Sequence, residues 1–379
     1  MPVPFYDHAK LYRSRQTELD AAIRRVLLSG RPDWGEEVPA FEGAFAEWLG
    51  VAHVVSVNSG TAALRVALKA LGIGPGDEVV TVPNSDIATT SAIHSVGARA
   101  VFVDVDETTL TMDVAALQRA LTPSTKAILP VDLFGHPADL PKILEIARAH
   151  GVFVVEDACL ALGGAIDERR IGHFSDITCF SFAPTKHLGS LGSGGACVTA
   201  DEALAERMQM IAAYGQSRSR HMQLAGTSLP LHHVTEGLNE RLDEVQAAIL
   251  RVKLPDLTES LATRAAQAAH YAEHLADLPI DLPQTRRRFR HAWRNYVIHT
   301  DDRNGLRAGL AERGIGTALS YAPAMHLQPV YAAMGHGPGS FPVAERSTDR
   351  LLGLPIGPHL AVDQIAEVAG AIRAVLGRA

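Results

Sequence analysis

The stretch that decides the fold is DITCFSFAPTKHLGSLGSGGAC, residues 176–197. It begins as an apolar, strand-like run, places Lys186 five residues after Ser181, and continues into a glycine-rich turn. A lysine between a buried strand and such a turn is costly to desolvate unless it is paired or covalently bonded. An aldehyde cofactor offers that bond, because a lysine amine forms a Schiff base with it. Ser181 suits a phosphate, and the glycines let backbone N–H groups approach an anion. The stretch alone is also compatible with a surface lysine on a flexible loop, so the other segments must decide.

Length and composition describe a globular chain with a large core. The 379 residues are enough for two domains, 47% of them are hydrophobic, and the formal net charge is -7. This charge argues against nucleic acid as the main partner. No apolar run reaches membrane-spanning length, and MPVPFYDHAK does not read as an export signal. The three cysteines form no CxxC pair and are typical of reduced thiols, so we expect a cytoplasmic protein that contacts no membrane.

Strands and helices alternate through the first part of the chain. Helices are predicted over 17–30 and 39–50, and a buried strand over 51–57 leads through Asn58-Ser59-Gly60-Thr61 into another helix. The alternation continues with strands at 77–82, 98–105, 126–132 and 152–156 and helices near 86–96, 113–121 and 139–150. This pattern predicts a mostly parallel sheet covered on both faces, with ligands at the carboxyl ends of its strands. The polar or turn residues at those ends are Asn58, Ser59, Pro83, Asp104, Asp132 and Asp157.

Two of these positions have a functional and a structural interpretation. Ser59, Gly60 and Thr61 open a helix, where backbone N–H groups and the helix dipole favour a phosphate, but an ordinary N-cap uses the same residues. Asp157 follows the apolar run 152–155, so its carboxylate needs a partner that favours ionisation. A protonated pyridine nitrogen is one such partner and would keep the ring an electron sink. A helix cap or loop aspartate is the alternative.

The remainder of the chain suggests a second, smaller α/β domain. Residues 215–236 lack periodicity, and 237–278 is a long amphipathic helical stretch interrupted at Pro255. A strand, a helix, a loop over 314–342 and a closing helix follow. We therefore predict a large domain over 1–250 and a small C-terminal domain over 251–379. No metal site is expected, because the histidines and cysteines lack ligand spacing. A nicotinamide site is disfavoured, because no GxGxxG follows the first strand.

Together these segments resemble a known family. The motifs NSGTAALRVALKALGIGPGDEVV, TKAILPVDLFGHPADL, VVEDACLALGG, SFAPTKHLGSLGSGGA and GLNERLDEVQAAIL have the order and spacing of the DegT/DnrJ/EryC1/StrS aminotransferases. The resemblance runs from about Trp34 through GIGTALSYAPAMHLQPVY to the closing helix. It implies the fold-type I architecture of pyridoxal-phosphate-dependent transferases, with pyridoxal 5'-phosphate as cofactor.

The resemblance also implies roles for single residues. Lys186 matches the Schiff-base lysine that also carries the proton between cofactor and substrate, and Asp157 matches the carboxylate under the pyridinium nitrogen. Asn239 matches an asparagine that reaches the phosphate of the neighbouring subunit's cofactor, which implies a homodimer with shared active sites and makes 215–236 a candidate crossing arm. The remaining cofactor contacts implied are Ser59, Gly60, Thr61, Asp86, Leu160 and Ser181, and the substrate contacts implied are His187, His326 and Tyr321.

The sequence departs from the family pattern at three positions. The turn Pro83-Asn84-Ser85-Asp86-Ile87 is one residue short and lacks the aromatic residue that usually stacks on the cofactor ring. Leu160 stands where the family has a glutamine that contacts the cofactor hydroxyl, and Leu162 stands where it has a histidine. These changes predict a more apolar pocket and a substrate that differs from the usual nucleotide-linked sugars.

We therefore expect an aminotransferase that moves an amino group from glutamate or glutamine to a keto-sugar, for which a nucleotide-linked sugar is expected, or to a keto-cyclitol. Two other functions stay open from the sequence. One is a dehydratase or elimination enzyme of the same family, in which the lysine is replaced by histidine; Lys186 favours transamination because a primary amine is needed for the Schiff base. The other is a non-catalytic regulator or binding module on the same scaffold, which the intact Lys186 and Asp157 disfavour.

Overall fold

A seven-stranded sheet forms the centre of the large domain in the computed structural model, which describes residues 2–216 and 233–377. Its strand order is β1-β9-β8-β5-β4-β2-β3. The pairs from β8 to β3 are parallel, whereas β9 runs antiparallel to both β1 and β8. The predicted mostly parallel α/β sheet is therefore confirmed. The strands are β1 (His53–Val57), β2 (Glu78–Thr81), β3 (Arg99–Phe102), β4 (Thr125–Ile128), β5 (Phe153–Asp157), β8 (Ile177–Ser181) and β9 (Gly195–Thr199).

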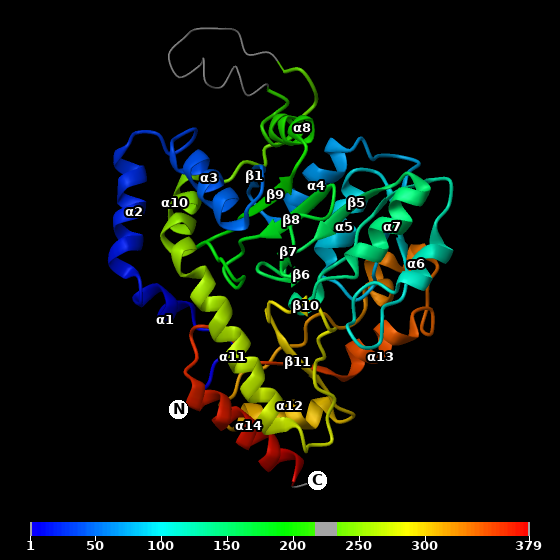
Figure 1. Cartoon of the computed structure of the whole chain (residues 1–379). Coiled ribbons are helices and arrows are strands. Elements are labelled where there is room, and N and C mark those ends of the chain that lie inside the picture. The colour runs from blue at the N-terminus through cyan, green and yellow to red at the C-terminus, as the bar shows by residue number, and fades with distance from the viewer. Residues whose placement is uncertain (1, 217–232, 378–379) are drawn as a thin grey trace.

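Helices pack around this sheet (Figure 1). Several begin where a polar side chain accepts a hydrogen bond from a backbone N–H of the first turn, which satisfies a donor that the helix leaves free. Ser59, Asp86, Asp113 and Asp201 cap α4, α5, α6 and α8 in this way. The helices are α2 (Gln16–Leu28), α3 (Glu37–Leu49), α4 (Gly60–Ala70), α5 (Ile87–Ser95), α6 (Val114–Ala120), α7 (Leu140–His150), α8 (Glu202–Ala212) and α10 (Glu244–Lys253).

The strands are buried because their sequences are almost continuously apolar. Val79, Val80, Ile128 and Val154 have no exposed surface, and helices α4, α5 and α7 pack against strands of this sheet. A parallel sheet covered on both faces requires this composition, whereas a half-exposed sheet would show alternation. Each such side chain contributes about 1.5–3 kcal/mol when it is fully buried.

The small domain has a core of its own, made of Tyr271, Tyr296, Ile298, Leu310, Leu352, Ile365 and Ile372 among others. Helix α11 (Leu257–Leu275) leads into it and packs on the closing helix α14 (Val362–Leu376) (Figure 1). The strands β11 (Tyr296–His299) and β12 (Leu351–Leu354) pair antiparallel, with α12 (Arg303–Glu312) packed beside them. The remaining α-helices and strands of the described residues are α1 (His8–Arg13), β6 (Ala165–Ile166), β7 (Arg169–Arg170), β10 (Phe289–Arg290) and α13 (Pro342–Arg350).

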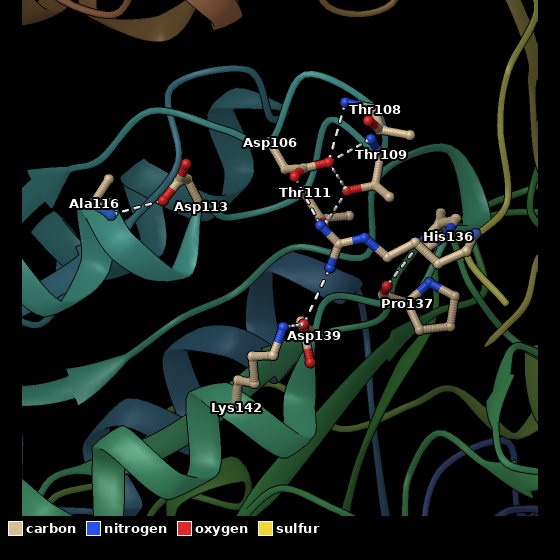
Figure 2. Close-up of polar contacts among 11 residues, drawn as sticks. Asp106, Thr108, Thr109, Thr111, Asp113, Ala116, His136, Pro137, Asp139 and Lys142 are labelled. Carbon is tan, nitrogen blue, oxygen red and sulfur yellow. Dashed lines mark hydrogen bonds and ion pairs between the residues drawn. The ribbon is translucent and has the colours of Figure 1, made fainter. Parts of the chain in front are cut away.

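Polar contacts join the segment after α11 to the large domain. Arg286 donates to Asp106 at 2.7 Å and to Asp139 at 3.0 Å, and these two carboxylates come from separate loops of the large domain (Figure 2). Burial raises the pKa of Asp106, but hydrogen bonds from Thr109 and the charge of Arg286 outweigh it and hold the pKa below its ordinary value. Asp104 joins the two parts as well, because it accepts hydrogen bonds from the Val343 and Ala344 N–H groups at the start of α13.

The expected helix is wrong over residues 237–243, because α10 begins only at Glu244. Backbone hydrogen bonds hold this segment extended: Asn58 N–H donates to the Glu240 carbonyl at 2.8 Å, and Leu238 N–H donates to the Ile211 carbonyl at 2.6 Å. Most of the candidate arm 215–236 lies outside the described residues. The division between residues 250 and 251 remains a prediction. No helix in the described ranges is long and apolar enough to cross a membrane.

Candidate active site

A cavity of about 260 Å³ lies at the carboxyl ends of the central strands. It receives side chains from the start of α4, the turn before α5, the end of β5 and the loop after β8. Nine of the twelve residues expected from the sequence to contact cofactor or substrate line it: Ser59, Gly60, Thr61, Asp86, Asp157, Leu160, Ser181, Lys186 and Tyr321. Segments far apart in the sequence thus converge on one site.

Close backbone approach brings these segments together. A Cβ atom on Gly195 would lie 2.4 Å from the Ser59 carbonyl oxygen, so only glycine lets β9 lie against the start of α4. A Cβ atom on Gly60 would lie 2.8 Å from both Cys159 Sγ and Ser181 Cβ. The glycines at these two positions therefore let the α4 turn meet the ends of β5 and β8.

Lys186 lies in the loop after β8 and is partly buried. Burial lowers the pKa of its ammonium group, and the positive charge of Arg294 lowers the pKa further, against opposing contributions from Cys159, Asp157 and Asp86. A lowered pKa increases the share of neutral amine at neutral pH. Lys186 is therefore suited to act as a nucleophile and to accept and return a proton.

Asp157 ends β5 and is only 5% exposed. Its Oδ2 accepts a hydrogen bond from Thr89 Oγ1 at 2.8 Å, and its Oδ1 accepts one from Cys159 N–H at 3.2 Å. Burial raises the pKa of Asp157, while the hydrogen bonds from Cys159 and Thr89 and the charge of Lys186 oppose that rise. Such a carboxylate is stabilised by a cationic ring nitrogen, so the structure fits the role expected for this residue.

The start of α4 serves as both an N-cap and an anion site. Ser59 Oγ accepts from Ala62 N–H at 3.0 Å, which is the ordinary capping interaction. The first-turn N–H groups of Gly60 and Thr61 lack helical partners by geometry, and both residues line the cavity together with Ser181. The two interpretations of this turn are therefore compatible, and these residues fit a phosphate.

The turn before α5 provides no aromatic ring. Asp86 Oδ1 accepts from Ala88 N–H at 2.9 Å and so caps α5. Leu160 lines the cavity, as expected from its position, whereas Leu162 packs in the core. Tyr321 is the aromatic residue among the described cavity-lining residues, and burial raises the pKa of its hydroxyl.

Three predicted contacts lie elsewhere in the structure. His187 is not among the residues that line the cavity, and its Nε2 lies 2.9 Å from the Ala292 carbonyl oxygen. His326 is buried, with Nε2 3.0 Å from Glu345 Oε1. Asn239 is exposed, its backbone carbonyl accepts a hydrogen bond from Asn58 Nδ2 at 3.3 Å, and it is not among the residues that line the cavity. Contacts of these three residues with substrate or cofactor remain predictions.

The sequence reasoning missed Thr89, which lies four residues after Ser85. The Thr89 and Ser85 hydroxyl groups form a hydrogen bond of 2.7 Å. The two hydrogen bonds that link Ser85 to Thr89 and Thr89 to Asp157 position the Asp157 carboxylate. The only sequence signal for Thr89 is the hydroxyl spacing in SDIATT, which is also common in ordinary helices.

Comparison with known proteins decides the family. The model of the DegT/DnrJ/EryC1/StrS aminotransferase family matches residues 13–373. This chain belongs to that family. It is 44% identical over 98% of its length to dTDP-3-amino-3,4,6-trideoxy-alpha-D-glucose transaminase of Streptomyces venezuelae, covering 95% of that protein. It is 39% identical over 99% of its length to UDP-N-acetyl-3-dehydro-alpha-D-glucosamine 3-aminotransferase of Acidithiobacillus ferrooxidans, covering 98% of that protein.

Solved structures of family members agree. The structure of S. venezuelae DesV in complex with a ketimine intermediate superimposes with a TM-score of 0.94 and 43% identity, covering 100% of this chain and 99% of that one. NtdA from Bacillus subtilis with bound cofactor PMP has a TM-score of 0.90 and 29% identity, covering 99% of this chain and 85% of that one. The chain is thus a pyridoxal-phosphate-dependent aminotransferase with the fold-type I architecture.

Proposed function

We propose that this aminotransferase delivers the amino group of glutamate or glutamine to a nucleotide-linked keto-sugar. The convergence of Lys186 and Asp157 on one cavity is the observation that carries the chemistry. The two relatives named above are, by their names, enzymes of dTDP- and UDP-linked sugars, which supports a nucleotide-linked acceptor for this chain. A keto-cyclitol acceptor is the alternative substrate that the test below must separate.

The residues of the candidate active site have different roles in this reaction. Pyridoxal phosphate, when bound, supplies an aldehyde for amines to condense with and a ring that withdraws electrons. Lys186 Nζ takes the proton from the donor's α-carbon and later gives a proton to the sugar carbon that receives nitrogen. Thr89 and the Cys159 N–H hold Asp157 in place. With the cofactor bound, Asp157 would hold the proton at the ring nitrogen, and Ser59, Gly60, Thr61 and Ser181, which line the cavity, would hold the phosphate.

The same proposal includes a homodimer in which Asn239 contacts the cofactor phosphate of the partner. Asn239 is exposed, and exposed aromatic side chains occur near it: Trp34 is 47% exposed and Tyr214 is 44% exposed. The Arg241 guanidinium lies 3.8 Å from the Trp34 ring centroid and 5.8 Å from that of Tyr214. Exposed aromatic and arginine groups are enriched at subunit interfaces. Sedimentation measures the mass of the expected dimer.

The three free thiols support a cytoplasmic location for this protein.

The test of the lysine assignment is Lys186→Ala. This variant is expected to fold, to lose the visible absorbance that the lysine linkage gives, and to lose turnover, because no other amine lines the cavity among the described residues. Lys126→Ala, which changes an exposed lysine on β4, is the matched control and should behave as wild type. Turnover retained by the Lys186 variant would refute the assignment.

Product analysis separates the remaining possibilities. Wild-type protein is supplied with glutamate and candidate keto-sugar nucleotides or keto-cyclitols, and the product mass is measured. Replacement of the keto oxygen by an amino group supports the proposal, whereas loss of water from the sugar without nitrogen transfer would indicate a dehydratase.

A further inference from the structure

A second cavity lies between the large and the small domain. Its volume is about 280 Å³, close to that of the active-site cavity, and the two cavities share no lining residue. The large domain contributes the loops after β3 and β4, and the small domain contributes β11, α13 and the segment before β10. Ligand sites occur preferentially at such boundaries between domains. None of the residues assigned above to the reaction lines this cavity, so the proposed function leaves it unexplained.

The side chain of Asn295 lines this cavity and has no hydrogen-bond partner among residues 2–216 and 233–377. Asn295 is only 5% exposed. Its backbone N–H donates to the Phe134 carbonyl at 3.2 Å, but its side-chain amide bonds to no described residue. The amide atoms are not enclosed by protein either, so they face the cavity. A buried amide without a partner is unfavourable, and the cavity is where its partner can bind.

His291 offers a hydrogen-bond donor to the same space. Its Nδ1 accepts a hydrogen bond from the Trp293 N–H at 2.8 Å. Burial, and then the charge of His136, lowers the pKa of His291 well below its ordinary value, so the ring is neutral at neutral pH. A neutral ring whose Nδ1 accepts carries its hydrogen on Nε2. This Nε2 has no partner in the described part of the chain, and His291 lines the cavity.

Two further histidines of the cavity wall are engaged with protein groups. His136 Nδ1 lies 2.7 Å from the Pro137 carbonyl oxygen, and His136 Nε2 accepts from the Arg286 N–H at 3.3 Å (Figure 2). His299 Nε2 lies 3.0 Å from Ser347 Oγ. Burial lowers the pKa of His136, and burial followed by the charge of Arg350 lowers the pKa of His299 to about 4. The imidazole rings of the wall are thus uncharged at neutral pH.

The charged side chains at the rim of the cavity are paired with one another. Arg346 donates to Glu107 at 2.9 Å, and Arg350 donates to Asp281 at 2.9 Å and to Asp301 at 2.8 Å. These pairs leave no unpaired arginine at the rim for an anion and no unpaired carboxylate for a cation. Within the described ranges, no three His, Cys, Asp or Glu side chains lie where they could hold a metal ion together. The wall therefore suits an uncharged ligand.

The remaining chemistry of the wall identifies the class of that ligand. A hydroxyl group both donates and accepts hydrogen bonds, so neighbouring hydroxyls match the nitrogen and the oxygen of the Asn295 amide, and one more can accept from His291 Nε2. The volume is many times that of one water molecule and lies near the lower end of the range for ligand sites. Buried apolar side chains, which suit the C–H surface of a ring, complete the wall: Leu110, Leu133, Phe134 and Val297.

We propose that this cavity binds a neutral polyhydroxyl ring compound, a monosaccharide or a cyclitol, through the Asn295 amide and the His291 Nε2–H. The site is separate from the reacting centre. Because its wall comes from both domains, the bound ring holds the domains in the arrangement described here and stabilises the folded chain by mass action.

The first experiment uses the wild-type holoenzyme, so that folding of a variant is not in question. D-Glucose and myo-inositol are titrated by ligand-observed NMR, with inorganic phosphate and uracil as competitors that lack the polyhydroxyl ring. We expect at least one of the two rings to bind with a Kd on the order of 1 mM, as is usual for so small a ligand. Binding of glucose alone identifies a sugar site, and binding of myo-inositol alone identifies a cyclitol site. Binding of neither ring, or displacement of the ring by phosphate or uracil, would overturn the proposal.

The second experiment compares Asn295→Leu with Asn304→Leu. Asn295→Leu should weaken binding of the ring about tenfold, because the amide hydrogen bonds are lost. Its free energy of unfolding should not fall, because the amide has no partner in the described protein to lose. Asn304 is exposed on α12 and serves as the matched control, which should bind the ring as wild type does. Asn295→Ala, which removes the amide without adding bulk, should weaken binding by the same factor.

The comparison also locates the bound ring. If both Asn295 variants bound the ring as tightly as wild type, the ring would lie elsewhere, for example in the active-site cavity, and the proposal would be refuted. The measurement needs no turnover, so it stays decisive if the proposed amino transfer fails.

Discussion

At the scale of single residues, the site depends on the way neighbours hold the ionisable groups. The Asp157 carboxylate accepts two hydrogen bonds, one from the Cys159 N–H in its own loop and one from the Thr89 hydroxyl of α5. Lys186 has opposite-sign and like-sign charges near it, and burial has the largest effect on its pKa. The functional state of both groups is therefore a property of their surroundings rather than of the two side chains alone.

Thr89→Val tests this dependence. The change removes the hydroxyl that donates to Asp157 Oδ2, so the pKa of Asp157 should rise and the cofactor should bind about tenfold more weakly, as expected for a lost hydrogen bond of about 1.5 kcal/mol to a charged group. The loss should grow as pH falls, because Asp157 then protonates more readily. Absorbance titration with pyridoxal phosphate measures the affinity.

Thr90→Val is the matched control for that variant. Thr90 Oγ1 is buried and has no hydrogen-bond partner in the described part of the chain, so removing it should leave cofactor affinity unchanged. Equal weakening in both variants would show that the effect comes from repacking of α5 and not from the contact with Asp157.

Sequence reasoning reached Lys186, Asp157 and Ser181 because each stands at the end of an apolar run where its type is unusual. It could not reach Thr89. A threonine within a helix is ordinary locally, and the importance of Thr89 comes from a partner 68 residues away. Tertiary proximity of this kind has no local pattern.

At the scale of elements, the alternation of strands and helices predicted the mostly parallel central sheet well, because buried parallel strands are nearly continuous apolar runs. The extended segment 237–243 was mistaken for helix. Its residues favour a helix locally, but backbone pairing with the Asn58 turn and with α8 outweighs that preference, and Glu240 forms an ion pair with Arg65 of α4.

Gly195→Ala tests the approach of β9 to α4. The added Cβ would lie 2.4 Å from the Ser59 carbonyl oxygen, so the start of α4 must move. We expect the free energy of unfolding to fall by about 1–3 kcal/mol and phosphate-dependent cofactor binding to weaken. Denaturant unfolding and cofactor titration measure the two effects.

The control substitution is Gly43→Ala in α3. This glycine is exposed within the helix, and an added Cβ would meet nothing within 4 Å. Alanine there should raise the free energy of unfolding by about 0.5–1 kcal/mol. If Gly195→Ala were as harmless as this control, the close approach would not matter for the site.

At the scale of the whole molecule, stability should depend on a buried acid pair, with Glu156 on β5 and Asp132 in the segment after β4. Asp132 and Glu156 have no exposed surface, and each retains one carboxyl oxygen without a partner in the described residues. Burial and then the charge of Glu156 raise the pKa of Asp132 well above its ordinary value, with Asp157 contributing in the same direction. The folded protein thus holds a proton that the unfolded chain releases.

The sign of the pH effect follows from this difference. The stabilisation is complete below the unfolded pKa of about 4 and is lost as pH rises toward the folded pKa, so the free energy of unfolding falls by up to about 1.4 kcal/mol per pH unit in that window. In Glu156→Gln a neutral amide replaces the ionisable carboxyl group. The free energy of unfolding should therefore fall less steeply as pH rises. Denaturant unfolding at a series of pH values from about 4 upward measures both slopes; identical slopes would show that the pair is not protonated.

The first residues of the chain belong with its last domain. Val3 is fully buried in the small-domain core, and its backbone bonds to Gly314 at 2.9 Å and Gly316 at 2.8 Å, whereas α2 and α3 pack on α10 of the large domain. The polypeptide therefore leaves the small-domain core after Val3 and returns to it after α10. Severing it near residue 250 would not release independent halves, because the C-terminal fragment would lack the edge that the N-terminus provides. Neither fragment should fold when it is expressed alone, whereas co-expression of the two fragments should give folded protein.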